Sequence, residues 1–287
     1  MIDGIPLVDA HLHPAHLQTI KMPVVEWASG FNSMAGIYDG EGAVIPAAFD
    51  AYLAAEGVDV AVLLPEYSPL STGIQPVEDL LPILEHNPAR MRFLANVNPY
   101  FHDPLVPELE RQLALGAVGL KLHPVHARFS PNDAVLWPLY VRCQELGVPV
   151  VFHCGTSVFP GAVNRYADPG LVDEVAGAFP DLTIVLAHGG RGWWYDAAAF
   201  ITQMRPNVWI ELSGLPPKKL PQYYRNFDLG RLGRKFVFAT DWPGVPGIAR
   251  NAAAVADLGF DRDTLELIFW RNAFSIYNLG APPTEWG

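Results

Sequence analysis

The chain has 287 residues, of which half are hydrophobic and 17% are charged, and this composition predicts a large buried core rather than a disordered polypeptide. Its formal net charge of −11 argues against binding to nucleic acid or to an anionic membrane surface. No apolar run reaches the ~18 residues of a transmembrane helix, and no secretory signal is visible. Cys143 and Cys154 fit free thiols in a reducing compartment, so we expect a cytoplasmic protein.

Short apolar or β-branched runs recur along the chain, and a stretch with helical periodicity follows each of them. Strands that alternate with helices imply parallel pairing through right-handed crossovers. Eight such units favour a (β/α)8 TIM barrel, with residues 1–287 forming a single domain. The predicted strands are 6–9, 59–64, 92–97, 118–122, 149–153, 183–187, 208–212 and 236–239.

The segment between the first predicted strand and the first predicted helix is long and apolar, with Met22, Trp27 and Phe31 among its residues. Such a loop in a barrel predicts either a lid over the site or a subunit interface, and the second interpretation allows a homodimer. The predicted helices are 47–56, 77–85, 107–115, 132–146, 170–179, 195–204, 220–227, 247–258 and 263–279.

Two histidines one residue apart end the first predicted strand, in the segment Asp9-Ala10-His11-Leu12-His13-Pro14. Side chains at i and i+2 of a strand point to the same face, about 6–7 Å apart. Asp9, His11 and His13 are therefore expected to project together. Two neutral imidazoles on one face are what a zinc-type ion requires, so this segment predicts half of a metal site.

Other ligand-capable residues also end predicted strands, where a TIM barrel carries its catalytic side chains. Lys121 and His123 end the fourth strand, and His153 ends the fifth. His188 follows the sixth strand and Asp241 the eighth. The barrel prediction therefore places all of them around one mouth. His16 and His126 lie in predicted loops and could line the pocket, although solvated surface positions are the default expectation.

This ordered set of motifs resembles the amidohydrolase superfamily over essentially the whole chain. It comprises His-x-His after strand one, histidines after strands five and six, and aspartate after strand eight. The segments 9–13, 119–124, 188–190 and 240–243 look more narrowly like the amidohydrolase-related branch. That branch contains aminocarboxymuconate-semialdehyde decarboxylase, resorcylate-type decarboxylases, and several hydrolases, lactonases and hydratases.

The resemblance implies that His11, His13, His153 and Asp241 hold one divalent metal with an open position for water or substrate. Zn²⁺ is the first choice, Mn²⁺ and Fe²⁺ are alternatives, and a second ion is not expected. The metal would lower the pKa of the water and polarise a substrate carbonyl. The resemblance also implies that His188 acts as the acid/base and that Asp241 accepts the proton of the water.

Two residues leave alternatives open. Lys121 could be a carboxylated lysine bridging two ions, a cation that binds an anionic substrate, or part of a structural ion pair. We favour the second interpretation, because Lys-x-His-Pro occurs in single-metal members of the branch. Asp9 is either a further metal ligand or a carboxylate that supports the ligands.

Three residues are predicted to face the substrate. His123 shares a strand face with Lys121 and is expected to face the substrate or to support a ligand. Arg191 either clamps a substrate carboxylate with two parallel hydrogen bonds or ties down its own loop. Trp193 either walls the pocket or packs beneath the loop.

These observations predict an enzyme that uses metal-activated water to hydrolyse a small amide, ester or lactone, with a carboxylate on the substrate. Metal-dependent, non-oxidative decarboxylation of an unsaturated or aromatic acid is the alternative, because both chemistries use the same ion and the same strands. A catalytically silent binding or scaffold barrel is the third interpretation, and the full set of ligand types argues against it.

Overall fold

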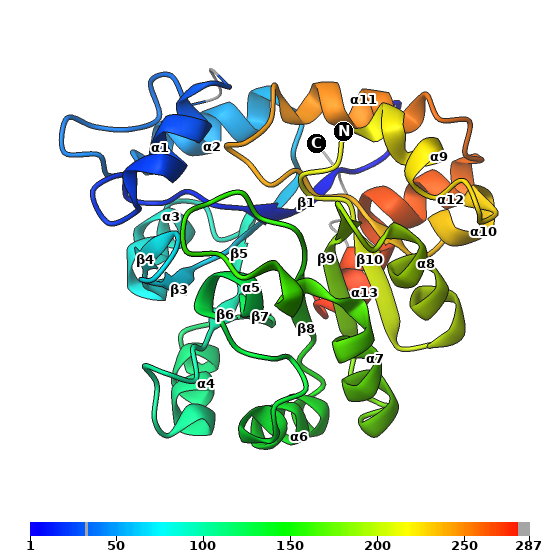
Figure 1. Cartoon of the computed structure of the whole chain (residues 1–287). Helices are drawn as coiled ribbons and strands as arrows, with labels where there is room; N and C mark the ends of the chain where they lie inside the picture. The colour runs from blue at the N-terminus through cyan, green and yellow to red at the C-terminus, as the bar shows by residue number, and fades with distance from the viewer. Residues whose placement is uncertain (32–33, 281–287) are drawn as a thin grey trace.

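The computed structural model describes residues 1–31 and 34–280. All eight predicted strand regions are strands, and the fold is the predicted (β/α)8 barrel, with strands in the middle and helices outside (Figure 1). The third region is divided into two short strands, since the pairing is interrupted at Leu94. The barrel strands are β1 (Val8–Leu12), β2 (Val60–Leu63), β5 (Met91–Phe93), β6 (Ala95–Asn96), β7 (Leu120–Leu122), β8 (Val150–Gly155), β9 (Ile184–Arg191), β10 (Val208–Glu211) and β11 (Phe236–Val237).

The strands pair in parallel in the orders β1-β2-β5 and β6-β7-β8-β9-β10-β11. Leu94 lies between β5 and β6, and its amide donates to the carbonyl of Leu63, so the chain itself joins the two sheets. At the other side, the amide of Ala10 donates to Phe238 O at 3.1 Å, and the amide of Asp241 donates to His11 O at 3.0 Å. These bonds close the ring and set the residues after β11 beside β1.

The packing of the strands explains where the polar side chains emerge. Alternate residues, among them Val151 and Ala239, pack in one apolar cluster with residues of the last helix. Because side chains alternate along a strand, His153 and Asp241 follow these residues on the same face, at the C-terminal ends. A second, larger cluster fills the space between strands and outer helices.

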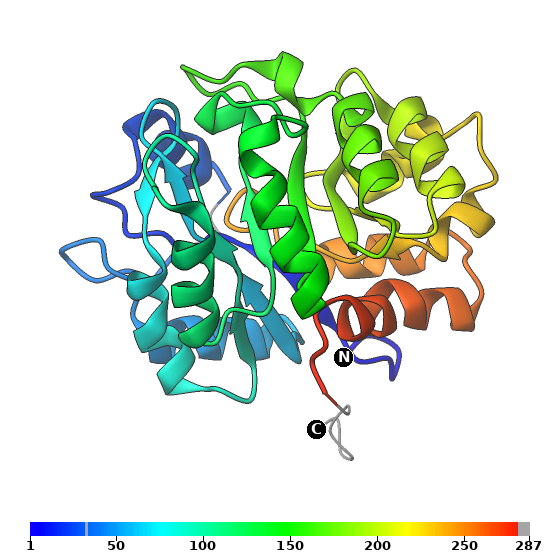
Figure 2. The ribbon, with the colours of Figure 1, turned by 90° about the horizontal axis from the view of Figure 1, so that it is seen from below.

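The outer helices follow the predicted pattern, and Figure 2 shows them arranged around the strands. The last predicted helix is interrupted by a π-helical turn at Leu267–Arg271. The helix predicted at 220–227 stops after one turn, and Asp228 caps a separate helix by accepting from the amide of Arg231. The helices are α2 (Pro46–Ala55), α3 (Leu81–His86), α4 (Leu105–Ala114), α6 (Trp137–Leu146), α7 (Pro169–Ala178), α8 (Tyr195–Met204), α9 (Leu220–Tyr223), α10 (Leu229–Gly233), α11 (Ile248–Ala256), α12 (Arg262–Glu266) and α13 (Asn272–Ile276).

Several short elements were not predicted, and they lie in the loops. Helix α1 (Met22–Ser29) forms within the long apolar segment after β1, and α5 (Pro124–Ala127) directly follows β7. An antiparallel hairpin of β3 (Glu66–Ser68) and β4 (Gly73–Gln75) follows β2. Across the described parts of the chain, no helix is both long and apolar enough to cross a membrane.

Candidate metal centre

A cavity of about 330 Å³ opens at the C-terminal ends of the strands. Polar side chains from the strand ends line one part of it, including His13, His123, His153, His188 and Asp241. Apolar side chains of the segment after β1 and of the loop after β8 line the rest, among them Leu17, Ile20, Val24, Val25, Trp27 and Phe159. The apolar segment after β1 therefore lines the site.

Three ligand-type atoms converge where β1 and β11 end: Nε2 of His11, Nε2 of His13 and Oδ1 of Asp241. The two nitrogens are 3.0 Å apart, and the Asp241 oxygen lies 3.5 Å from His11 and 3.6 Å from His13. Ligands bound about 2.1 Å from a tetrahedral ion are about 3.4 Å from one another. The first histidine group, as we name His11, His13 and Asp241, therefore has the spacing of one coordination sphere and fits a divalent metal.

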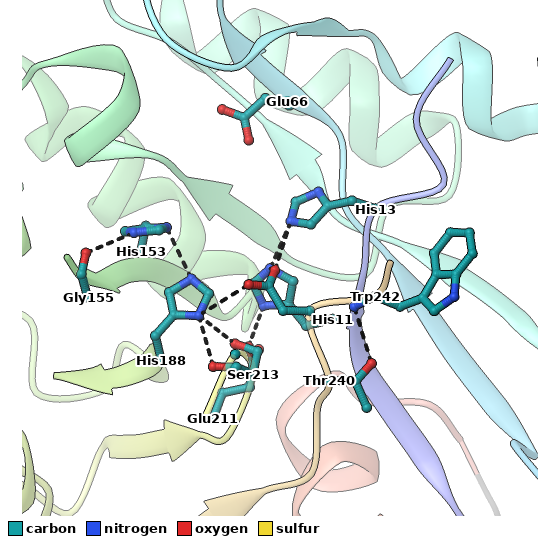
Figure 3. A network of polar contacts seen from close by, with 12 residues as sticks. His11, His13, Glu66, His153, Gly155, His188, Glu211, Ser213, Thr240 and Trp242 are labelled. Carbon is teal, nitrogen blue, oxygen red and sulfur yellow. Dashed lines mark hydrogen bonds and ion pairs between the residues drawn. The ribbon is translucent and has the colours of Figure 1, made fainter. Parts of the chain in front are cut away.

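The ring of His11 is held from behind by Glu211, at the end of β10 (Figure 3). The carboxylate contacts Nδ1, which leaves Nε2 turned toward His13 and Asp241. Burial holds the pKa of His11 well below its ordinary value and lowers that of His13, so both rings are neutral, the form that ligates metals. A carboxylate behind a ligating imidazole is a recurrent feature of metal sites.

Sequence reasoning missed Glu211. Burial raises the pKa of its carboxyl group, whereas the neighbouring Lys121 lowers it. The sequence feature that could have identified it is an acidic residue at the end of the otherwise apolar strand Val208–Glu211.

His188 and Asp241 share an unusual backbone conformation at the site. Both have positive φ angles, 67° for His188 and 71° for Asp241, a region that disfavours residues with a Cβ. Such strain persists only where the surroundings impose it, and it is concentrated at functional sites. Nδ1 of His188 lies 3.0 Å from the Ser213 carbonyl and 3.9 Å from Oδ2 of Asp241. The predicted acid/base thus stands beside the first histidine group.

The structure places His153 in a different group from the one that the sequence predicted. Its ring centroid lies 4.6 Å from that of His126, and its Nδ1 is 3.1 Å from Nε2 of His188. His123, His126 and His153 have ligand atoms that all lie within 4.8 Å of one another. The reason is the position of the strand in the barrel. Strand β8 pairs with β7, so His153 faces the residues that follow β7.

Glu66 completes what we name the second histidine group: His123, His126, His153 and Glu66. Its carboxylate oxygens lie 3.1 Å from Nδ1 of His123 and 3.5 Å from Nδ1 of His126. Of the two interpretations of His126, the structure shows the pocket-lining one rather than a solvated position: α5 folds back toward β3, and the ring is buried and lines the cavity. Glu66 was also missed, although it directly follows the Leu64-Pro65 end of the second predicted strand.

Asp9 and Lys121 are buried beneath the cavity and do not line it. The Asp9 carboxylate accepts hydrogen bonds from the Thr240 hydroxyl at 2.6 Å and the Thr240 amide at 3.0 Å, so it ties β1 to the segment after β11. Burial raises the pKa of Asp9 to about 7. Burial also lowers the pKa of Lys121, whose charge faces Glu211 and Asp241. This position fits the ion-pair interpretation of Lys121 better than direct substrate binding.

Arg191 lines the cavity, whereas Trp193 does not. The Arg191 guanidinium has one nitrogen 3.8 Å from Oδ2 of Asp241 and donates another to Thr156 O at 3.0 Å. A Cβ at Gly214 would lie 2.2 Å from this guanidinium, so glycine permits the approach. Trp193 is 69% exposed and packs against Trp194, which gives no support to the pocket-wall interpretation.

The comparisons with known proteins agree with this geometry. A family model described as amidohydrolase matches residues 8–279. A search of curated proteins finds no match to the sequence.

Similar solved structures share the fold along nearly the whole chain. An uncharacterised TIM-barrel protein from Bordetella bronchiseptica has a TM-score of 0.77 and 20% identity, with 96% of this chain and 99% of that chain covered. A dihydroxybenzoic acid decarboxylase from Polaromonas, solved with manganese and 2-nitroresorcinol, has a TM-score of 0.69 and 16% identity, with 97% and 98% covered. A probable 2-pyrone-4,6-dicarboxylic acid hydrolase from Acinetobacter baumannii, solved with citric acid, has a TM-score of 0.66 and 16% identity, with 96% and 100% covered.

Proposed function

This chain belongs to the amidohydrolase family, and we propose that it is a metal-dependent hydrolase of a small amide, ester or lactone that carries a carboxylate. The observation that carries the proposal is the first histidine group, in which two imidazole nitrogens and a carboxylate oxygen lie 3.0–3.6 Å apart beside a cavity. A cavity of about 330 Å³ is at the small end of the range for ligand sites, so it suits a single-ring substrate rather than a polymer.

His11, His13 and Asp241 would hold the metal, with Glu211 fixing the orientation of His11. Two imidazoles and a carboxylate suit Zn²⁺ first and also Mn²⁺ or Fe²⁺. When bound, the ion supplies Lewis-acid activation of water and of the substrate carbonyl. The manganese in the Polaromonas decarboxylase makes Mn²⁺ the first alternative to test.

The protein's own groups supply the proton transfers and the binding. Asp241 would accept the proton of the attacking water through Oδ2, and His188 would return a proton to the leaving group. Arg191 would bind the substrate carboxylate, because its guanidinium is the one Lys or Arg group among the described residues that line the cavity. The apolar wall formed by α1 and Phe159 would exclude bulk water from the reacting bond.

Decarboxylation of an aromatic or unsaturated acid is the second candidate function. The apolar wall favours it, because transfer of a carboxylate from water to such a wall is costly and the cost is relieved as CO₂ forms. In that reaction the bond between the ring carbon and the carboxyl group breaks, and His188 or Asp241 would deliver the proton that replaces CO₂. A third interpretation, a silent binding barrel, requires that the first histidine group have no catalytic role.

A product assay on the purified, metal-loaded protein separates these functions. We expect acid release from aryl esters, lactones or amides with one carboxylate, and no CO₂ release. CO₂ release from hydroxybenzoates without hydrolysis would replace the first function by the second. Metal content below about a tenth of an equivalent after gentle purification, with no rate lost in His11→Asn, would instead favour the silent barrel.

A further inference from the structure

One carboxylate at the wall of the cavity has no role in the function proposed above. Apart from Asp241, Glu66 is the one Asp or Glu side chain among the described residues that line the cavity. It belongs to β3, directly after the second barrel strand, and it is only 5% exposed. A buried carboxylate is costly unless it is paired or hydrogen-bonded, so the partners of Glu66 indicate what it can still bind.

The protein fixes the position of this carboxylate without filling all of its acceptor sites. The Thr72 hydroxyl donates to Oε1 of Glu66 at 2.8 Å. Nδ1 of His123 lies 3.1 Å from Oε2, and Nδ1 of His126 lies 3.5 Å from Oε1. An ionised carboxylate accepts at about four lone-pair positions, so at least one position remains for a donor that enters the cavity.

The charge of Glu66 determines which groups it accepts. Although burial alone would raise the pKa of Glu66, the neighbouring His123 and His126 rings hold it below its ordinary value, so the side chain is an anion at neutral pH. A hydrogen bond to an ionised acceptor is stronger than one between neutral groups. A second anion at this position would instead be repelled.

Glu66 lies on the opposite side of the barrel mouth from the cationic group of the cavity. It follows β2, the second barrel strand in the ring, whereas Arg191 ends β9, which lies in the sixth position. The second and sixth strands of an eight-stranded ring face each other across its axis. Figure 3 shows Glu66 set apart from the first histidine group and His188. The cavity therefore has an anionic side and a cationic side, with the first histidine group at strands one and eight.

We propose that Glu66 determines substrate specificity by accepting a hydrogen bond from a hydroxyl group of the substrate, at the end opposite the carboxylate that Arg191 binds. The inference rests on the hydrolase function proposed above and narrows its substrates to single-ring acids with one carboxylate and one neutral hydrogen-bond donor. A second carboxylate is excluded, because it would meet the charge of Glu66. A hydroxyl is favoured over an ammonium group, because the apolar wall makes a further charge costly to desolvate.

Calorimetric titration of the full-length, Mn²⁺-loaded protein tests the proposal without turnover. The probes are phenylacetate, its 3- and 4-hydroxy derivatives and its 3- and 4-carboxy derivatives, which contain no bond that the proposed hydrolysis cleaves. We expect the better hydroxy derivative to bind at least about 10-fold more tightly than phenylacetate, because a charge-assisted hydrogen bond is gained. Both carboxy derivatives are expected to bind at least about 10-fold more weakly than phenylacetate.

Substitutions at the two sides of the cavity separate the two ends of the probe. Glu66→Gln keeps the size of the side chain and removes its charge, so we expect both differences to shrink to about 3-fold or less. Arg191→Gln is expected to weaken phenylacetate and its hydroxy derivatives by the same factor and to keep the preference for the hydroxyl. Glu110→Gln changes an exposed carboxylate of α4 and is the matched control, which should bind every probe as the wild type does.

Thr72→Val keeps the proposal testable if Glu66→Gln fails to fold. It removes the hydroxyl that holds Oε1 of Glu66, and we expect the preference for the hydroxy derivative to fall about 3-fold while the affinity for phenylacetate is unchanged.

Three results would overturn the proposal: equal wild-type affinities for phenylacetate and both hydroxy derivatives, tight wild-type binding of a carboxy derivative, or an unchanged hydroxyl preference in Glu66→Gln. Failure of the proposed hydrolysis would be seen in the product assay instead. These binding differences need no turnover, so they would remain intact in that case.

Discussion

The two histidine groups that face each other across the cavity differ in how their rings are held. In the first group, Glu211 contacts the rear nitrogen of His11, so the protein itself orients the ligand atom. In the second group, the Glu66 carboxylate faces two rings, 3.1 Å from Nδ1 of His123 and 3.5 Å from Nδ1 of His126. The first group is therefore oriented by a carboxylate behind one ring, whereas in the second group a carboxylate lies between two rings. Substitutions in and around the first group measure how much this arrangement contributes to activity, metal affinity and stability.

The largest expected effect comes from Asp241→Asn. It removes the carboxylate that lies 3.5–3.6 Å from both imidazole nitrogens of the first group. We expect kcat/KM to fall by at least about 1,000-fold, because the ion and the proton acceptor are lost together. Steady-state kinetics and metal analysis measure this. Asp257→Asn, at the end of α11, is the matched control and should behave as wild type. Full activity in Asp241→Asn would remove the first group from catalysis.

His188→Asn separates proton transfer from metal binding. The ring stands beside the first group without belonging to it, so we expect kcat to fall about 100-fold or more while the metal content stays unchanged. Kinetics and metal analysis on the same preparation measure both quantities. Loss of metal together with rate would make His188 a ligand rather than an acid/base.

Glu211→Gln tests the organisation of the first group directly. The substitution keeps the size of the side chain and removes the charge behind His11. We expect the affinity of the first group for Mn²⁺ to fall about 10- to 100-fold. Calorimetric titration of the stripped protein with Mn²⁺ measures this affinity. An unchanged affinity would contradict the role of Glu211 in orienting His11.

Thr240→Val tests the contact that holds β1 against the segment after β11. The hydroxyl donates to the buried Asp9 carboxylate at 2.6 Å, and valine cannot. We expect the free energy of unfolding to fall by about 1–3 kcal/mol, because a buried acceptor loses its partner. Urea denaturation measures the loss. Thr183→Val, just before β9, is the control and should change the unfolding free energy by less than about 0.5 kcal/mol.

The smallest effect is expected at the wall of the cavity. The indole of Trp27 packs edge-to-face on Phe159 with centroids 5.6 Å apart, and it lies so close to Gly244 that a Cβ there would overlap it. We expect Trp27→Ala to raise KM about 5- to 10-fold, since it removes apolar contact with the substrate. A lower kcat at constant KM would indicate that α1 acts on the reaction step instead.

Most of the barrel could be predicted from local patterns in the sequence. Runs such as Val150–Phe152 are apolar on both faces, which marks a parallel strand beneath helices, and Gly or Pro marks where each run ends. The candidate residues His11, His13, His188 and Asp241 could be found because they directly follow such runs. The helix predicted at 220–227 was wrong, since its apolar pattern does not reveal that the chain turns after Tyr223.

Three site residues escaped prediction because their importance comes from contacts with distant segments of the chain. Glu66 follows the second barrel strand but belongs to a separate hairpin, and His126 lies on a single helical turn, whereas His153 is part of a barrel strand. Glu211 is the last residue of a strand, and its importance comes from a contact with His11, 200 residues away in the sequence. Such contacts are set by the packing of distant segments.

By itself, the sequence determined the strands, their order and the ligand types at their ends, because side-chain alternation and chain breakers act over a few residues. The tertiary structure alone decided which histidines stand together. The closing bonds between β1 and the segment after β11 bring Asp241 to His11 and His13. The pairing of β7 with β8 brings His153 to His123 and His126 instead. Partition into two groups depends on the positions of strands around a closed ring, which no short stretch of sequence encodes.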